Sequence, residues 1–419
     1  MYKYLAGILD AIRVMGVIFL FAWISFFAPV IGERYEFLFL FATVVFLLIL
    51  FIFDRNRLFN KEDAFFWIFL LAIMAGLVNV KDVSTAYRHF WVYVFPMPFL
   101  YLYAKLSFRE KYGALILRCI CIMAGAVAID GFIELFSSKN FAYLKYMDNL
   151  YYKSYIGIRM MSTHIHPAPL GTYLVAIFPL TLALYMMEKA RFLKAVSIVC
   201  AISIFTAIIF TFSRGAFIGL FIEMLIIAVF SIKKKKIFYI YILLFPILLF
   251  IIGSLFEVFD IYKYCRFGYK DLGRWFIYSR KIDALMGAAR MLKDHPFFGV
   301  GFGHYRVLFD NYFPLSIVKE TIYDQKVADC MYVTILAETG IIGFGGFIFF
   351  IINAFKNAWK ALKVRLTSDE GLLLLGFFAG FCGMMATFLT YDGLYWTAPA
   401  YMFWAYAGIL ASFIAEKRA

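Results

Sequence analysis

Apolar runs of about 20 residues recur along the whole chain, and they constrain the fold more than any other feature. A helix of that length crosses the hydrocarbon layer of a bilayer, which is about 30 Å thick. Hydrophobic residues make up 64% of the 419 residues and charged residues only 16%, unlike a typical soluble domain. The sequence therefore predicts an all-α polytopic membrane protein. It excludes a disordered chain, a disulfide-stapled secreted domain and a nucleic-acid-binding protein.

About twelve of these runs are long enough to span a membrane as helices. The first run has no small-residue cleavage site after it and is followed directly by another, so we expect a retained helix rather than a signal peptide. The predicted spans are residues 8–30, 35–53, 64–80, 90–106, 113–136, 168–187, 192–212, 215–232, 237–257, 331–355, 370–391 and 395–414.

Basic residues concentrate in alternate loops between the predicted spans. Examples are the run from Lys233 to Lys236 and the group of Lys356, Lys360 and Lys363. Because Lys and Arg are retained on the cytoplasmic side of a membrane, we expect these loops and both termini to be cytoplasmic. The net charge of +14 thus reflects orientation in a membrane rather than binding to nucleic acid.

Two predicted outer segments, residues 137–167 and 258–330, are much longer than the other outer loops. The second is rich in aromatic residues and contains a helical pattern from Ser279 to Lys293, so we expect it to be folded. The chain then divides into residues 1–257 with nine spans, a loop domain at 258–330, and residues 331–419 with three spans. The six cysteines form no disulfide framework, although a bridge between Cys265 and Cys330 at the outer face remains open.

The turn between the seventh and eighth predicted spans is the first cluster of polar residues at the outer face. It contains Ser213, Arg214 and Gly215. An arginine at the start of a helix suits a phosphate, because the helix N-terminus adds positive partial charge and the guanidinium matches the phosphate oxygens. The alternative is that Arg214 snorkels and merely marks the interface.

A second cluster, with Arg159, His164 and His166, precedes Pro167 and the sixth predicted span. Two histidines at this spacing permit a metal pair, but no third ligand lies nearby in the sequence, so we expect no metal here. Capping of the following helix and hydrogen bonding to a substrate are the favoured roles.

The third cluster begins at Arg280, continues as an amphipathic pattern and ends with His295 and the glycines 299, 301 and 303. We expect the helix to lie against the membrane or the bundle, and the glycine turn to pack the loop onto the bundle. The glycines follow no strand, so they are not a dinucleotide site. Arg280 and Arg274 are further phosphate-binding candidates, with a plain surface charge as the alternative. The expected apolar face consists of Ile282, Leu285, Ala289, Met291 and Leu292.

The fourth cluster surrounds the start of the tenth predicted span, with Asp329, Tyr332 and Glu338. A carboxylate where the outer loop meets the bundle can accept a proton from a hydroxyl group. Glu338 lies about two turns into the span and requires a partner there. Asp392, between the last two spans, is a third candidate carboxylate. For each of the three, a structural ion pair is the alternative.

In their order along the chain, these blocks resemble the O-antigen ligase and polymerase superfamily of bacterial envelope membrane proteins. The resemblance extends over residues 155–350. Its blocks are Thr211, Ser213, Arg214 and Gly215; Arg280 before His295, Pro296, Gly299 and Gly301; the segment 337–343; and the stretch 159–174.

The resemblance implies a metal-independent glycosyltransferase of GT-C type, multi-pass in the bacterial inner membrane. Such an enzyme moves a glycan from undecaprenyl pyrophosphate to an acceptor sugar hydroxyl on the periplasmic face. The lipid donor is already activated, so no cofactor is expected. By this resemblance, Arg214 and Arg280 bind the pyrophosphate. Ligases typically carry His-Asn where this chain has Asp329 and Cys330, which makes Asp329 a candidate base in place of that histidine.

Two activities within the family remain open. A ligase hands a glycan to lipid A-core, whereas a polymerase joins repeat units into a growing chain. The compact chain with one dominant outer loop favours a ligase, while Asp329 favours a polymerase. Protein O-glycosylation uses the same chemistry. The catalytic candidates are Asp329, Arg214 and Arg280, and the substrate-binding candidates are Arg159, Ser213, His164, His166, Arg274, His295, Tyr332 and Glu338.

A twelve-span transporter or flippase is the alternative from a different class of protein. Transporters place charge near the middle of the membrane and usually consist of pseudo-symmetric halves. Here the polar clusters gather at one face and the largest loop is off-centre, which favours an enzyme. The expected partners are the lipid-linked glycan, its acceptor and membrane lipids, with no nucleic acid.

Overall fold

The computed structural model describes residues 2–28, 39–48, 61–137, 159–231, 280–312, 327–366 and 368–415. Within these segments every regular element is helical, and six helices are long and apolar enough to cross a membrane. The prediction of an all-α multi-pass membrane protein is therefore confirmed for the described part of the chain. The total of about twelve spans and the GT-C type remain predictions.

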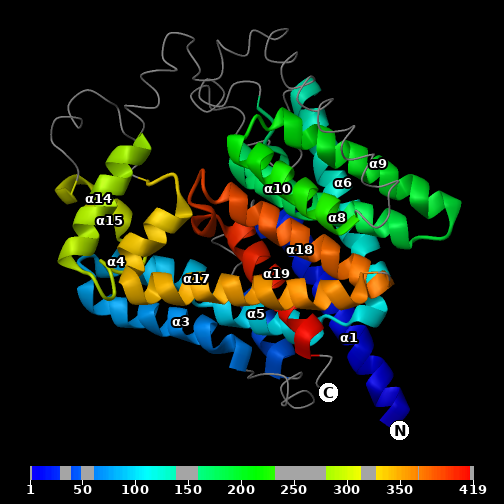
Figure 1. Ribbon diagram of the computed structural model, residues 1–419, viewed down its shortest axis with the longest axis horizontal. Coiled ribbons are helices and arrows are strands. Elements are labelled where there is room, and N and C mark those ends of the chain that lie inside the picture. The colour runs from blue at the N-terminus through cyan, green and yellow to red at the C-terminus, as the bar shows by residue number, and fades with distance from the viewer. Residues whose placement is uncertain are drawn as a thin grey trace.

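The helices form a bundle, with α4, α14 and α15 at one end of it (Figure 1). They are α1 (Tyr2–Ala22), α3 (Ala64–Gly76), α4 (Val83–His89), α5 (Pro96–Ser107), α6 (Gly113–Ser137), α8 (Pro167–Met187), α9 (Arg191–Phe210), α10 (Arg214–Ser231), α14 (Arg280–Asp294), α15 (Tyr305–Tyr312), α17 (Met331–Arg365), α18 (Asp369–Thr387) and α19 (Thr397–Ala415).

Several predicted spans match helices closely, among them residues 168–187 with α8 and 192–212 with α9. The predicted span 90–106 lies inside a longer helical stretch, in which α4 continues through the π-helix Phe90–Val94 into α5. The predicted span 35–53 is described only as the helix Phe39–Leu48, and 237–257 lies outside the described residues.

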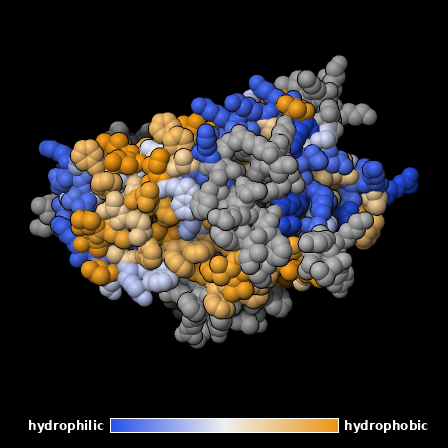
Figure 2. Space-filling view, turned by 90° about the horizontal axis from the view of Figure 1, so that it is seen from below, coloured by the Kyte–Doolittle hydropathy of each residue, from blue (hydrophilic) through white to orange (hydrophobic). Residues whose placement is uncertain are grey.

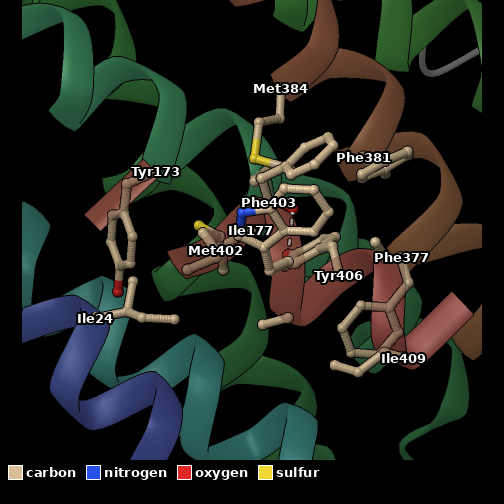
Figure 3. Close-up of a cluster of buried hydrophobic side chains, with 14 of the residues drawn as sticks. Ile24, Tyr173, Ile177, Phe377, Phe381, Met384, Met402, Phe403, Tyr406 and Ile409 are labelled. Atoms are coloured by element: carbon tan, nitrogen blue, oxygen red, sulfur yellow. Dashed lines mark hydrogen bonds between the residues drawn. The ribbon is translucent and has the colours of Figure 1, made fainter. Parts of the chain in front are cut away.

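The core of the bundle is the packing of α18 against α8, α10 and α19. Nearly every side chain of α18 is buried, as expected for a helix that is hydrophobic all round. Small residues let the helices approach closely, since a Cβ on Gly380 would lie 2.1 Å from the carbonyl oxygen of Ala176. Figure 3 shows how aromatic and aliphatic side chains, including Tyr173, Phe381 and Phe403, fill the space between these helices.

The surface of the bundle agrees with a protein that spans a membrane. Figure 2 shows a face on which apolar side chains cover most of the left half, while hydrophilic ones gather at the left edge and on the right side. Large exposed apolar residues such as Phe192, Ile202 and Phe349 contribute to the apolar surface of the molecule. A lipid-facing belt between two polar ends requires this distribution.

The end of the bundle that carries α14 and α15 is called the loop end below (Figure 1). Ion pairs collect at the opposite end, where α5, α8 and α17 finish and α6 begins. This is the end that carries several of the loops rich in Lys and Arg, so the structure agrees with their predicted location on one side; that this side is cytoplasmic remains a prediction. The pairs include Lys105 with Asp63, Arg118 with Glu188, and Arg365 with Glu110.

α14 packs against α17 and α15 rather than standing apart from the bundle. Its buried face consists of Gly287, Ala288 and Met291, where the small side chains allow close approach. The predicted apolar face was wrong in part, because Leu285 and Ala289 are exposed. The glycine turn that follows the helix is fixed to α17, and this anchor sets which face of α14 turns inward.

Candidate active site

Residues 388–396, between α18 and α19, form the centre of the loop end and are called the 388–396 loop. The backbone N–H of Met331, at the start of α17, donates to the carbonyl oxygen of Phe388 over 2.9 Å. The ring of Trp396 lies 5.3 Å from the ring of His166, centroid to centroid. The loop therefore contacts two of the polar clusters that the sequence singled out.

The 388–396 loop also carries Asp392, whose buried carboxylate meets the start of α17. The hydroxyl of Thr334 donates to Asp392 Oδ1 over 2.6 Å, and the backbone N–H groups of Asp329 and Cys330 also donate to this carboxylate. Burial raises the pKa of Asp392 to about 6, and the carboxylate of Asp329 raises it as well, against the hydrogen bond from Thr334. Two of the candidate carboxylates thus lie side by side.

Asp329 has a backbone conformation that is uncommon for residues other than glycine. Its φ angle is 51°, in the left-handed region that costs a residue with a Cβ about 1–3 kcal/mol. Its side chain is half-buried, whereas that of Asp392 is only 7% exposed. Of the pair, Asp329 is therefore the member that a substrate can reach.

Arg214 is exposed and is the first residue of α10. The side chain of Ser213 accepts a hydrogen bond from the backbone N–H of Ala216 over 3.4 Å, which caps the helix start. A Cβ on Gly215 would lie 2.1 Å from Thr390 Oγ1, so the N-terminus of α10 packs directly against the 388–396 loop. The structure thereby brings the Arg214 turn to the same loop as Asp392.

The segment 159–166 lies against the other side of the Arg214 turn and is called the 159–166 loop. Arg159 Nε donates to the carbonyl oxygen of Thr211 over 3.0 Å, and the N–H of Met160 donates to the carbonyl of Phe210 over 2.9 Å. Two turns that are far apart in the sequence are therefore joined, and Arg159 adds a guanidinium beside the turn that carries Arg214.

Both histidines of the 159–166 loop are neutral in this environment. Burial lowers the pKa of His166 to about 3, with a further contribution from the charge of Arg159, and burial lowers the pKa of His164 to about 3. His166 Nδ1 accepts from the N–H of Ala168 over 3.2 Å, which confirms the predicted cap on α8. His164 packs on Tyr173, and its Nε2 has no hydrogen-bond partner among the described residues.

α17 is broken at Gly340, where φ is 65° and ψ is −169°. The glycine turn after α14 fills the break and pairs with its free backbone groups, so the predicted packing of this turn onto the bundle is confirmed. Such pairing is required of irregular backbone inside a membrane. The bonds run from Val300 N to Ala337 O, from Gly301 N to Glu338 O, from Ile341 N to Pro296 O and from Ile342 N to Phe297 O, at 2.9–3.2 Å.

Glu338 lies next to this break and is 1% exposed. One carboxylate oxygen accepts from the N–H of Tyr305, at 2.9 Å, and the other accepts from the hydroxyl of Tyr395. The partner that Glu338 was expected to need is thus provided by α15 and the 388–396 loop. Its predicted role in substrate binding stays a prediction.

The remaining predicted site residues lie at the edge of this arrangement or outside the described residues. Tyr332 donates its hydroxyl to the carbonyl of Met385 over 2.8 Å, and His295 is half-buried in the turn after α14. Arg280 is the first residue of α14, but its side chain lies outside the described part. Arg274 and Cys265 also lie outside it, and Cys330 has a free thiol.

The structure adds polar groups that sequence reasoning missed, because they lie within or at the end of predicted membrane spans. The hydroxyl of Tyr391 donates to Thr172 Oγ1 over 2.6 Å, and Thr172 donates to Thr387 Oγ1 over 2.8 Å, beside the Arg214 turn. The presence of threonines within spans was the available signal. Across the described segments, no three His, Cys, Asp or Glu side chains gather as metal ligands. Metal independence stays a prediction.

Comparison with known families agrees with these blocks. No curated protein matches the chain. Residues 196–348 match a family model described as O-Antigen ligase. The matched range contains α9 from residue 196 on, α10 with the Arg214 turn, both helices of the loop end and α17 through its break at Gly340. This match covers about a third of the chain and agrees with the resemblance to the O-antigen ligase and polymerase superfamily.

Proposed function

We propose that the chain transfers a glycan from undecaprenyl pyrophosphate to a hydroxyl of an acceptor sugar, with lipid A-core as the acceptor. The observation that carries this proposal is the meeting of the Arg214 turn and the Asp329–Asp392 pair at the 388–396 loop. A glycosyl transfer from a lipid pyrophosphate needs both parts, a cationic site for the leaving group and a base for the acceptor. We place the reaction at the loop end, on the periplasmic face.

Arg214 stabilises the departing pyrophosphate. The bond from the anomeric carbon to the phosphate oxygen breaks with its electron pair going to the pyrophosphate, so negative charge develops there. A fixed guanidinium at a helix N-terminus stabilises that charge without reorganisation. Arg159, bonded to Thr211, adds a second positive charge to this site. Arg280, at the start of α14, is the third cation that we assign to it.

Asp329 acts as the base toward the acceptor. As the acceptor oxygen forms its bond to the anomeric carbon, the hydroxyl proton passes to the Asp329 carboxylate. Asp392 supports this step by accepting the backbone N–H of Asp329, which fixes the position of the residue.

The two neutral histidines have a different role in this scheme. An uncharged imidazole adds no positive charge for the pyrophosphate, so His164 and His166 contribute hydrogen bonds and shape. No cofactor is proposed, because the lipid pyrophosphate is itself the leaving group.

A polymerase that joins lipid-linked repeat units is the second candidate. The observation that favours it is Asp329 at the place where ligases typically carry a histidine. The chemistry at the anomeric carbon is the same, and only the acceptor differs.

The test is transfer by the purified protein from an undecaprenyl-pyrophosphate glycan, with lipid A-core in one reaction and no acceptor in the other. A single adduct that forms only with lipid A-core supports the ligase. A ladder of lengthening lipid-linked glycan without it supports the polymerase. No product in either reaction, together with movement of labelled lipid-linked glycan across vesicles that contain only this protein, contradicts the proposal and favours a transporter.

A further inference from the structure

The 159–166 loop is held by a carboxylate from outside the matched family domain. Glu134 lies in the last turn of α6 and is only 5% exposed. Its Oε2 accepts two neighbouring backbone N–H groups, from Met161 over 3.0 Å and from Ser162 over 2.6 Å. A buried carboxylate is costly unless hydrogen bonds compensate it, and here the loop backbone provides them.

Ser162, the residue that Glu134 holds, has a strained backbone. Its φ angle of 47° lies in the left-handed region, which a serine adopts only when its surroundings enforce it. Its hydroxyl lies 2.8 Å from Asp130 Oδ2, one turn earlier in α6, and 2.7 Å from the carbonyl oxygen of Val127. The last turns of α6 therefore hold Ser162 through both its backbone and its side chain.

Two hydrogen bonds connect the 159–166 loop, which contains Ser162, to the Arg214 turn. Met160 donates its N–H to the carbonyl of Phe210, and Arg159 Nε donates to the carbonyl of Thr211. Phe212, which follows, also has a positive φ angle, of 46°. Two strained turns thus support each other, and Arg214 begins the helix directly after the second one.

We propose that Glu134 is a positioning residue for the donor. It fixes the 159–166 loop so that Arg159 holds the 211–213 turn, and with it Arg214, in the geometry that binds the pyrophosphate. This inference rests on the proposed function, since it assigns the two arginines to the donor. It extends the site to α6, which neither the sequence motifs nor the matched domain includes.

The test compares Glu134→Ala and Glu134→Gln with Glu188→Ala in the full-length protein. Glu188 is the matched control, because it is also a buried carboxylate but pairs with Arg118 at the opposite end of the bundle. We expect Glu134→Ala to raise the donor KM about tenfold, the effect of losing hydrogen bonds to a charged acceptor. The acceptor KM stays within about twofold. Glu134→Gln keeps the donor KM of the parent, since an amide oxygen accepts the same N–H groups. Glu188→Ala leaves the donor KM unchanged.

A double-mutant cycle separates positioning from a general loss of stability. If Glu134 acts through Arg159, the donor KM of the double variant Glu134→Ala/Arg159→Ala equals that of Arg159→Ala alone. Should Glu134→Ala fail to insert, Ser162→Ala replaces it, with a smaller rise of about threefold in donor KM expected from the loss of one hydrogen bond.

Two results would overturn the inference: additive effects in the cycle, or equal changes in donor and acceptor KM. An effect of Arg159→Ala without any effect of Glu134→Ala would also overturn it, while leaving the proposed function intact. An unchanged donor KM in Arg159→Ala would instead remove Arg159 from the donor site, and the inference would fall with it.

Discussion

Replacing Gly340 by Ala is expected to reduce the free energy of unfolding by about 3–9 kcal/mol. The φ and ψ angles of Gly340 belong to a region that is essentially restricted to glycine, at a cost of about 1–3 kcal/mol for other residues. The added Cβ would also lie 2.4 Å from the carbonyl carbon and oxygen of Phe297. The segment that fills the break must then move away, which leaves the N–H groups of Ile341 and Ile342 without their hydrogen-bond acceptors, at about 1–3 kcal/mol each in a membrane.

The matched control is Gly345→Ala in the same helix. A Cβ at Gly345 meets no atom within 4 Å, so this variant is expected to be as stable as the parent or about 0.5–1 kcal/mol more stable. The measurement is reversible unfolding of both variants in mixed detergent micelles, followed by tryptophan fluorescence. If Gly340→Ala unfolds at the same denaturant concentration as Gly345→Ala, the break is not held by the contacts described above, and the reasoning is refuted.

Three further predictions concern the site. Thr334→Val removes the hydrogen bond that lowers the pKa of Asp392, so we expect this pKa to rise further above about 6. As the pH is lowered, the variant then loses activity at a higher pH than the parent. If the acidic side of its pH–activity profile matches that of the parent, the role of the carboxylate pair is contradicted. Gly215→Ala places a Cβ against Thr390 and displaces Arg214, so we expect kcat/KM for the donor to fall about 10- to 100-fold. The control is Gly7→Ala, whose Cβ meets no atom within 4 Å and which is expected to have no effect. Equal kcat/KM values for the two variants would show that this contact does not position the start of α10. Transfer persists in excess EDTA, and a loss that zinc or magnesium reverses would instead indicate a metal site.

The helices of the bundle were predictable where hydropathy alone decides the structure. α8 and α9 begin and end near the predicted residues, because a membrane span is set by an uninterrupted apolar run. The stretch from Val83 to Ser107 was predicted too short, since Arg88 and His89 interrupt the apolar pattern without ending the helix.

The break in α17 was not predictable in the same way. The helix contains several glycines, including Gly343 and Gly345, and only the distant segment 296–301 determines that Gly340 is the one at which the helix breaks. The buried face of α14 also depended on this anchor, which explains why Leu285 was placed on the wrong face.

The candidate site was predictable as a set of clusters but not as an arrangement. The Arg214 turn and Asp329 were identified because they are charged residues at the ends of predicted spans on one face, and charge beside a bilayer usually has a function. The contact between Asp329 and Asp392, and the support from Glu134, join residues far apart in the sequence. No spacing rule connects such residues, so only the packed structure could bring them together.

The central claim is that Arg214 binds the pyrophosphate of the donor during glycosyl transfer. Its most direct test is the rate of transfer by purified Arg214→Ala beside Arg191→Ala, which removes an exposed arginine at the far end of α9. We expect Arg214→Ala to insert normally and to lose about 100-fold or more in kcat/KM for the donor, and Arg191→Ala to keep the parent rate. Transfer by Arg214→Ala at the parent rate would contradict the claim.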